Sequence, residues 1–196
     1  MFIIAIAGDD GRGKSTLARN LAELISKEID CCFIRPFAES LRREVKAFLP
    51  SHIDPWQKPT PEWLRDLLKG WGAMRRAEDP DYWIQSWRTA TLGLGGVAII
   101  DDLRYLNEMN FVQGRHGIVL FLDHGDKRRL GYELSLVRPH ADQRFLVDPV
   151  AGHYASTEMA YRLIVEFQQR QEVKAFPLLG QSLPSVAERQ PSDRSG

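Results

Sequence analysis

The sequence predicts one three-layer α/β domain, in which a mostly parallel sheet is covered by helices on both faces. Two observations lead to this prediction. Strand-like and helix-like segments alternate along the chain, and the strand-like segments are apolar at nearly every position, as expected when both faces of a sheet are buried. With 196 residues, 43% of them hydrophobic, the chain is long enough for one such core.

The first part of the chain predicts two strands and two helices. The apolar run FIIAIA predicts a strand over 2–7, and leucines and an isoleucine at helical spacing predict a helix over 15–27. A short strand over 31–34 and a helix over 38–48 follow. The proline- and tryptophan-rich segment 50–63 either shapes a ligand pocket or only connects two helices.

The middle of the chain continues this alternation. Helices are predicted over 64–76 and 82–92, and the run GGVAIIDD predicts a buried strand over 95–102 that ends in two acids. A helix over 106–113 precedes another buried strand, GIVLFLDH, over 117–124. Because ligands of such sheets bind at the carboxyl ends of the strands, the polar residues there are the expected site.

The last part of the chain has a weaker pattern. Residues 124–153 carry arginines with scattered glycine and proline, which predicts a mobile, lid-like insertion. A final helix is predicted over 156–171. From residue 180 the composition turns to serine, proline, glutamine and charge, which predicts a disordered tail over 180–196. The folded domain is therefore expected to span 1–179.

A glycine-rich loop, GDDGRGKST, follows the first strand and opens the first helix. Gly8, Gly13, Lys14 and Ser15 fulfil the pattern G-x-x-x-x-G-K-[ST] of a phosphate-binding loop. Glycines let backbone N–H groups converge on phosphate oxygens, the lysine reaches the β- and γ-phosphates, and the serine hydroxyl can bind Mg²⁺. The loop predicts a P-loop NTPase fold with ATP as phosphoryl donor and Mg²⁺ as cofactor.

The residues of this loop form most of the predicted ATP site. The carboxylates of Asp9 and Asp10 are expected to point outward, so that only backbone amides face the phosphates; alternatively, one carboxylate touches a substrate sugar or a magnesium-bound water. A dinucleotide-binding fingerprint is rejected, because its third glycine is missing and a lysine follows Gly13 at once. The predicted set is Asp10, Gly11, Arg12, Gly13, Lys14, Ser15 and Thr16.

Two acids and an arginine follow the strand over 95–102. Asp101 or Asp102 is predicted to hold Mg²⁺ through water beside the loop, with Ser15 as the other protein ligand. Arg104 lies two residues beyond Asp102, close enough to share the cleft, so Lys14, Asp102 and Arg104 are the predicted catalytic residues. Alternatively, the two acids only cap the helix that follows.

The segment DDLRYLNE resembles the D-x-R-x-x-N-E segment of phage-type deoxynucleoside monophosphate kinases, within the P-loop nucleoside monophosphate kinase superfamily. The segments FAESLRREVKAFL, RDLLKGWG and DPDYW resemble further parts of that family in the same order. The resemblance covers 1–123 and thins afterwards. It implies transfer of the γ-phosphoryl group of ATP to a deoxynucleoside monophosphate, for the supply of deoxynucleoside triphosphates.

The resemblance also implies where the acceptor binds. It assigns this role to a region over about 36–92, and arginines suit the role because two anionic phosphates must be brought together. Each arginine could instead belong to a solvated helix face, and Trp83 to the core. Carried over by position, the acceptor residues are Arg42, Arg65, Trp83, Asp102, Arg104 and Glu108.

The arginines of 124–153 are expected to serve a lid. A lid that closes over ATP would exclude water, so that the phosphoryl group goes to the acceptor and is not hydrolysed. One or two of Arg128, Arg129 and Arg138 are expected to do this, and Arg128 and Arg129 complete the predicted ATP site.

Three alternatives to this kinase stay open. A thymidylate kinase shares DG-x-GKST, although its Asp-Arg-Tyr element is missing here. A P-loop kinase acting on a modified base in DNA is the second. The third is a nucleotide-dependent switch, which the absence of the guanine-binding pattern Asn-Lys-x-Asp disfavours.

The composition indicates which classes of binding partner to expect. Lys+Arg and Asp+Glu both number 26, and this zero net charge makes a nucleic acid an unexpected partner. The two adjacent cysteines, Cys31 and Cys32, support neither a disulfide framework nor a zinc site. Without a long apolar run or a signal peptide, we expect a cytoplasmic protein, in the host cytoplasm if phage-encoded, that binds small nucleotides and no membrane. A homodimer is compatible with the sequence.

Overall fold

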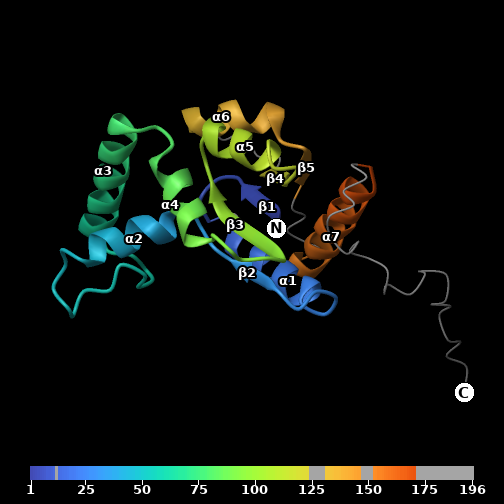
Figure 1. Cartoon of the computed structure of the whole chain (residues 1–196), viewed down its shortest axis with the longest axis horizontal. Coiled ribbons are helices and arrows are strands. Elements are labelled where there is room, and N and C mark those ends of the chain that lie inside the picture. Colours follow the sequence, from blue (N-terminus) through green and yellow to red (C-terminus); the bar gives the residue numbers. More distant parts are fainter. Residues whose placement is uncertain (12, 124–130, 147–151, 171–196) are drawn as a thin grey trace, which may run out of the picture.

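The computed structural model describes residues 1–11, 13–123, 131–146 and 152–170. Five strands form one sheet in the order β2-β3-β1-β4-β5, and every neighbouring pair is parallel. The strands are β1 Phe2–Ala7, β2 Cys32–Ile34, β3 Val97–Leu103, β4 Ile118–Asp123 and β5 Gln143–Leu146. Strand β1 therefore lies at the centre, between β3 and β4 (Figure 1).

Seven α-helices and one short 3₁₀-helix are found in the described ranges, and most connect successive strands. Because parallel strands need a crossover, the helices between two strands return the chain from the carboxyl end of one strand to the amino end of the next. The helices are α1 Lys14–Ile25, α2 Ala38–Lys46, α3 Glu62–Glu78, α4 Tyr82–Ala90, α5 Leu106–Gln113, α6 Tyr132–Val137, η1 Arg138–His140 and α7 Gly152–Arg170.

The sheet is buried on both faces because alternate residues of each strand point into different cores. Ile4 and Ile6 of β1 pack with α1 and α7, whereas Ile3 and Ala5 pack with α4, α5 and α6. All six residues of β1 are at most 2% exposed. This three-layer arrangement confirms the predicted fold class.

Helices α2 and α3 form a small region of their own. Val45, Leu64 and Leu68 make a separate buried cluster, which Leu41 and Trp71 border. Figure 1 shows these two helices beside one end of the layered body. The region is attached through the start of α2, which is bound to Asp102 near the carboxyl end of β3, and through α4, which contacts both α2 and α3.

The predicted elements agree with the structure to within a few residues up to β4. Three described elements inside the predicted insertion 124–153 were not predicted, namely α6, η1 and β5. Strand β5 has the sequence QRFL, whose polar half gives no buried-strand signal, and α6 is only six residues long. Part of this segment therefore completes the sheet, because β5 pairs with β4. The predicted tail 180–196 lies outside the described residues.

Candidate active site

The phosphate-binding loop joins β1 to α1 and is shaped by its glycines. Gly8, Gly11 and Gly13 have φ values of 138°, 74° and 84°, in the region that favours glycine. A Cβ on Gly8 would lie 2.9 Å from the backbone oxygen of Leu122 on β4, so the loop begins pressed against the neighbouring strand. Gly13 directly precedes α1, whose first backbone N–H groups are free for an anion.

Lys14 folds back over this loop. Its Nζ atom donates hydrogen bonds to the backbone oxygens of Gly8 and Asp9, both at 2.7 Å. The side chain is buried, and this burial lowers its pKa, although the carboxylates of Asp10 and Asp101 act in the opposite direction. Lys14, which is predicted to contact the phosphates, is therefore held against the loop, where the negative charge of Asp101 near the end of β3 acts on it.

Arg104 reaches the same loop from the neighbouring strand. One guanidinium nitrogen, Nη2, forms an ion pair with Oδ1 of Asp10, and the Nζ atom of Lys14 lies 3.8 Å from that same oxygen. The positive charge of Arg104 repels that of Lys14 and lowers the pKa of the lysine ammonium group. The pairing of β1 with β3 thus brings two cations from distant segments to one carboxylate oxygen.

The two acids at the end of β3 have different surroundings. Asp102 accepts hydrogen bonds from the backbone N–H groups of Phe37 and Ala38, at 2.9 and 2.8 Å, and so ties the start of α2 to the sheet. Burial raises its pKa to about 6, and Asp101 adds to this rise. Asp102 therefore binds a helix start, and its catalytic and acceptor roles stay predictions. Asp101 is the acid whose charge raises the pKa of Lys14.

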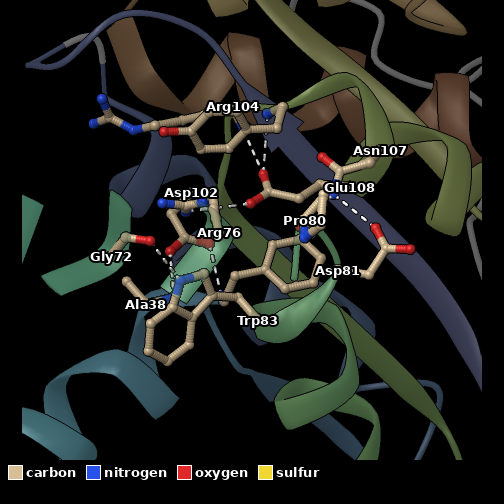
Figure 2. A network of polar contacts seen from close by, with 12 residues as sticks. Ala38, Gly72, Arg76, Pro80, Asp81, Trp83, Asp102, Arg104, Asn107 and Glu108 are labelled. Carbon is tan, nitrogen blue, oxygen red and sulfur yellow. Dashed lines mark hydrogen bonds and ion pairs between the residues drawn. The ribbon is translucent and has the colours of Figure 1, made fainter. Parts of the chain in front are cut away.

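Glu108 fixes the backbone of Arg104. Its Oε2 atom accepts hydrogen bonds from the N–H groups of Arg104 and Tyr105, at 2.8 and 3.1 Å, at the start of α5 (Figure 2). Its Oε1 atom lies 3.8 Å from Nη2 of Arg76. The side chain is 3% exposed, and burial raises its pKa to about 7. The predicted acceptor residue Glu108 thus holds Arg104 in place through its main chain.

Arg76 is a site residue that the sequence analysis missed. It comes from the last turn of α3, and its guanidinium lies over the ring of Tyr105, 4.1 Å from the ring centroid. Gly72, one turn earlier, leaves room for it, because a Cβ there would lie 3.2 Å from Nη1 of Arg76. A glycine inside a helix, four residues before an arginine, is the signal that could have indicated this arrangement.

The other predicted acceptor residues lie on three helices, with Arg42 on α2, Arg65 on α3 and Trp83 on α4. Trp83 is 3% exposed, and its indole N–H donates to the backbone oxygen of Gly72 at 3.2 Å, so its ring packs between helices. Arg42 donates to the backbone oxygen of Pro55, and exposed Arg65 donates to that of Thr60 at 3.3 Å. Stacking of a base on Trp83, and contacts of the two arginines with an acceptor, stay predictions.

The remaining predicted residues concern the metal and the lid. The side chain of Ser15 is exposed and Thr16 is half-buried at the start of α1. Arg138 forms an ion pair with Asp123 at the end of β4. Arg12, Arg128 and Arg129 lie outside the described residues.

The donor set fits Mg²⁺ with a substrate phosphate better than a cation held by protein alone. Within the described ranges, no group of three or more His, Cys, Asp or Glu residues is arranged to hold a metal ion. Magnesium usually keeps several waters and takes one or two protein ligands beside phosphate oxygens. A serine hydroxyl at the loop, with Asp101 close enough to raise the pKa of the adjacent Lys14, matches that requirement.

Comparison with known proteins gives likenesses of fold alone. No family model matches the chain, and no curated protein matches it. Among solved structures, a hexameric APS kinase from Thiobacillus denitrificans aligns with a TM-score of 0.43 and 14% identity over 84% of this chain. The chain spans only 29% of the length of that protein.

Two further solved structures align over most of both chains. A sugar kinase from Janibacter aligns with a TM-score of 0.43 and 15% identity, over 83% of this chain and 94% of its own. A shikimate kinase from Bacteroides thetaiotaomicron aligns with a TM-score of 0.39 and 14% identity, over 88% and 99%. A search of the described helices finds none with the length and apolar character needed to cross a membrane.

Proposed function

We propose that the protein transfers the γ-phosphoryl group of ATP to a deoxynucleoside 5′-monophosphate, as a cytoplasmic enzyme that supplies deoxynucleoside triphosphates. The observation that carries this proposal is the position of Lys14 and Arg104, which both lie near the same oxygen of Asp10 in a phosphate-binding loop. Two cations that meet at one oxygen of a carboxylate can equally share an oxygen of a phosphoryl group.

The donor half of the site consists of the loop and the residues that follow it. Backbone N–H groups of the loop and of the first turn of α1 would hold the β- and γ-phosphates, and Lys14 would leave the loop carbonyls to contact them. Ser15 and Asp101 are the residues that would hold Mg²⁺. The ion supplies neutralisation of phosphate charge when it is bound.

The acceptor half is built on Arg104 and Arg76. Arg104 directly follows β3, and Arg76 reaches the same segment from α3. Glu108 accepts a hydrogen bond from the backbone of Arg104 and lies beside Arg76. An oxygen of the acceptor phosphate attacks the γ-phosphorus, the bond from that phosphorus to the β–γ bridging oxygen breaks, and ADP leaves. Positioning and charge neutralisation by the two arginines are the contribution of the protein. Arg42, Arg65 and Trp83 are proposed to contact the remainder of the acceptor.

The zero net charge of the chain favours a small acceptor over a base within DNA. Diphosphate formation is the test, measured with ATP, Mg²⁺ and each of the four common deoxynucleoside monophosphates and their ribose forms. We expect one or a few deoxynucleotides to be converted, and Lys14→Ala to abolish conversion. ATP binding without transfer to any of the eight acceptors would contradict the proposal, and oligonucleotides would then be tried.

A further inference from the structure

A second concave site lies away from the phosphate-binding loop. It is a cleft of about 940 Å³ between α4 and α5, which extends to Met1 before β1 and to the turn before β3. None of the residues assigned to the proposed reaction lines it. A volume of this size is at the upper end of the range for small-molecule sites.

The floor of the cleft is aromatic and rigid. The rings of Trp87 and Phe111 meet edge to face, with their centroids 5.8 Å apart, and Ile84 lies beside them. Trp87 is 1% exposed, and its indole N–H donates to the backbone oxygen of Arg35 at 2.8 Å. The polar atom of this ring is therefore satisfied, and half-buried Phe111, supported by buried Trp87 and Ile84, is the floor residue that offers apolar surface to a ligand.

One end of the cleft is closed by hydrogen bonds. The side-chain amide of Asn107 on α5 donates to the backbone oxygen of Pro80 and to the carboxylate of Asp81, both at 2.8 Å. Asp81 is the only acidic residue among those that line the cleft, and this amide already occupies its carboxylate.

The two walls carry opposed positive charges. Arg88 comes from the last turn of α4, and Arg115 follows α5. In the described part of the chain neither side chain forms an ion pair, and the guanidinium of Arg115 rests 5.0 Å from the centroid of the Phe111 ring. Both residues are exposed and line the cleft, so their charges are accessible to a ligand that enters it.

The mouth of the cleft adds apolar surface. Leu92 is 85% exposed and Leu94 is 44% exposed, on the turn between α4 and β3. An apolar floor and mouth with two unneutralised arginines suit a ligand that has a negatively charged group and an apolar body. We propose that the cleft between α4 and α5 is a second ligand site, which binds a small organic anion with an aromatic or aliphatic body.

The fluorescent aromatic sulfonate 8-anilinonaphthalene-1-sulfonate tests this proposal, because it combines one negative charge with apolar rings. The full chain is titrated with the probe in the presence of saturating ATP and Mg²⁺, which occupy the phosphate-binding loop. We expect saturable binding of one probe per chain. The double variant Arg88→Ala/Arg115→Ala is expected to weaken it at least tenfold, and Asn110→Glu, which places an acid in the cleft, to weaken it without removing either arginine.

Two controls separate this site from the loop and from general surface charge. Arg162→Ala removes an exposed arginine of α7, and Lys14→Ala alters the loop; both are expected to bind the probe as the unaltered protein does. The proposal would be overturned if the double variant and Asn110→Glu both bound the probe as tightly as the unaltered protein does. Displacement of the probe by ATP, or no saturable binding at all, would also overturn it. None of these outcomes depends on whether the chain transfers phosphoryl groups.

Discussion

The carboxyl edge of the sheet and the α2–α3 region both carry arginines, but they use them differently. At the sheet edge, Arg104 pairs with the side chain of Asp10, 94 residues earlier in the chain. In the α2–α3 region, Arg42 and Arg65 donate to backbone oxygens of Pro55 and Thr60, a short distance along the chain. The first arrangement is a tertiary contact between charges, and the second stabilises a local connection.

This difference indicates which arginine is available to a phosphate. The side chains of Asp10 and Arg104 are 77% and 47% exposed, and exposed ion pairs contribute only about 0–1 kcal/mol. A phosphate group, which has more charge and more acceptor oxygens, can therefore replace Asp10 as the partner of Arg104. Replacement of a backbone carbonyl would instead leave the connection between α2 and α3 unsupported.

The largest expected effect is that of Lys14→Ala at the sheet edge. The substitution removes the ammonium group that reaches the β- and γ-phosphates, so we expect kcat/KM to fall by about 10²–10³-fold. Steady-state kinetics with ATP and the preferred acceptor measure it, and circular dichroism checks the fold. Lys27→Ala, at an exposed position just after α1, is the matched control. Turnover like that of the unaltered protein would remove Lys14 from the mechanism.

Arg104→Ala is expected to have the next largest effect. Without the guanidinium, neither the acceptor nor the transferred group is neutralised from the β3 side, and we expect about a 10²-fold loss in kcat/KM for the acceptor. Arg104→Lys should recover part of it. Arg43→Ala removes an exposed arginine of α2 as a control. An unchanged kcat/KM in Arg104→Ala would show that the arginine at the sheet edge is no more important for the acceptor phosphate than those of the α2–α3 region.

Glu108 is where the two regions meet, and its pKa gives a prediction on stability. The pKa is about 7 in the folded protein against an ordinary value of 4.5, so the folded state binds more protons between these pH values. The free energy of unfolding therefore falls as pH rises from 5 to 8. In Glu108→Gln we expect this fall to be about 1–3 kcal/mol smaller, because the side chain can no longer ionise.

Urea denaturation at a series of pH values measures this difference. Asp102 has a raised pKa of about 6 and contributes a fall of the same sign, so the Gln variant keeps part of the pH dependence. The glutamine oxygen still accepts the N–H groups of Arg104 and Tyr105, which preserves the start of α5. If the free energy of unfolding depended on pH in the same way in both proteins, the pKa of Glu108 would not be raised by folding.

The smallest expected effect is that of Arg65→Ala in the α2–α3 region. This exposed side chain makes one long hydrogen bond to a nearby carbonyl, and we expect the acceptor KM to change by less than about threefold. The same assay used for Arg104→Ala gives the direct comparison. A loss as large as that of Arg104→Ala would place Arg65 on the acceptor phosphate and erase the contrast between the regions.

The sequence predicted the parts of the site that depend on local order. The loop pattern placed Lys14 and Ser15, and the apolar strand ending in acids placed Asp101 and Arg104 beside it, because parallel strands end at one edge. Arg76 could not be placed in this way, since it reaches Tyr105 from a helix through tertiary packing. The sequence also left Trp83 open between ligand contact and core, and only packing against Gly72 shows its burial.

Strand β5 shows a second limit of sequence reasoning. Its neighbour β4 is apolar up to its final residue, Asp123, but β5 lies at the edge of the sheet and needs no such run. Pairing with β4, and not its own composition, decides that it is a strand.

The central position of β1 has a consequence for synthesis of the chain. Phe2 pairs with Val97 and Ile4 with Ile118, so β1 is synthesised more than ninety residues before either of its neighbouring strands. Six buried apolar residues must remain without a strand partner until β3 emerges. Nascent chains stopped before residue 97 would therefore expose this segment to chaperones and to aggregation. We expect chaperones to release the chain only after β3 has been synthesised and can pair with β1.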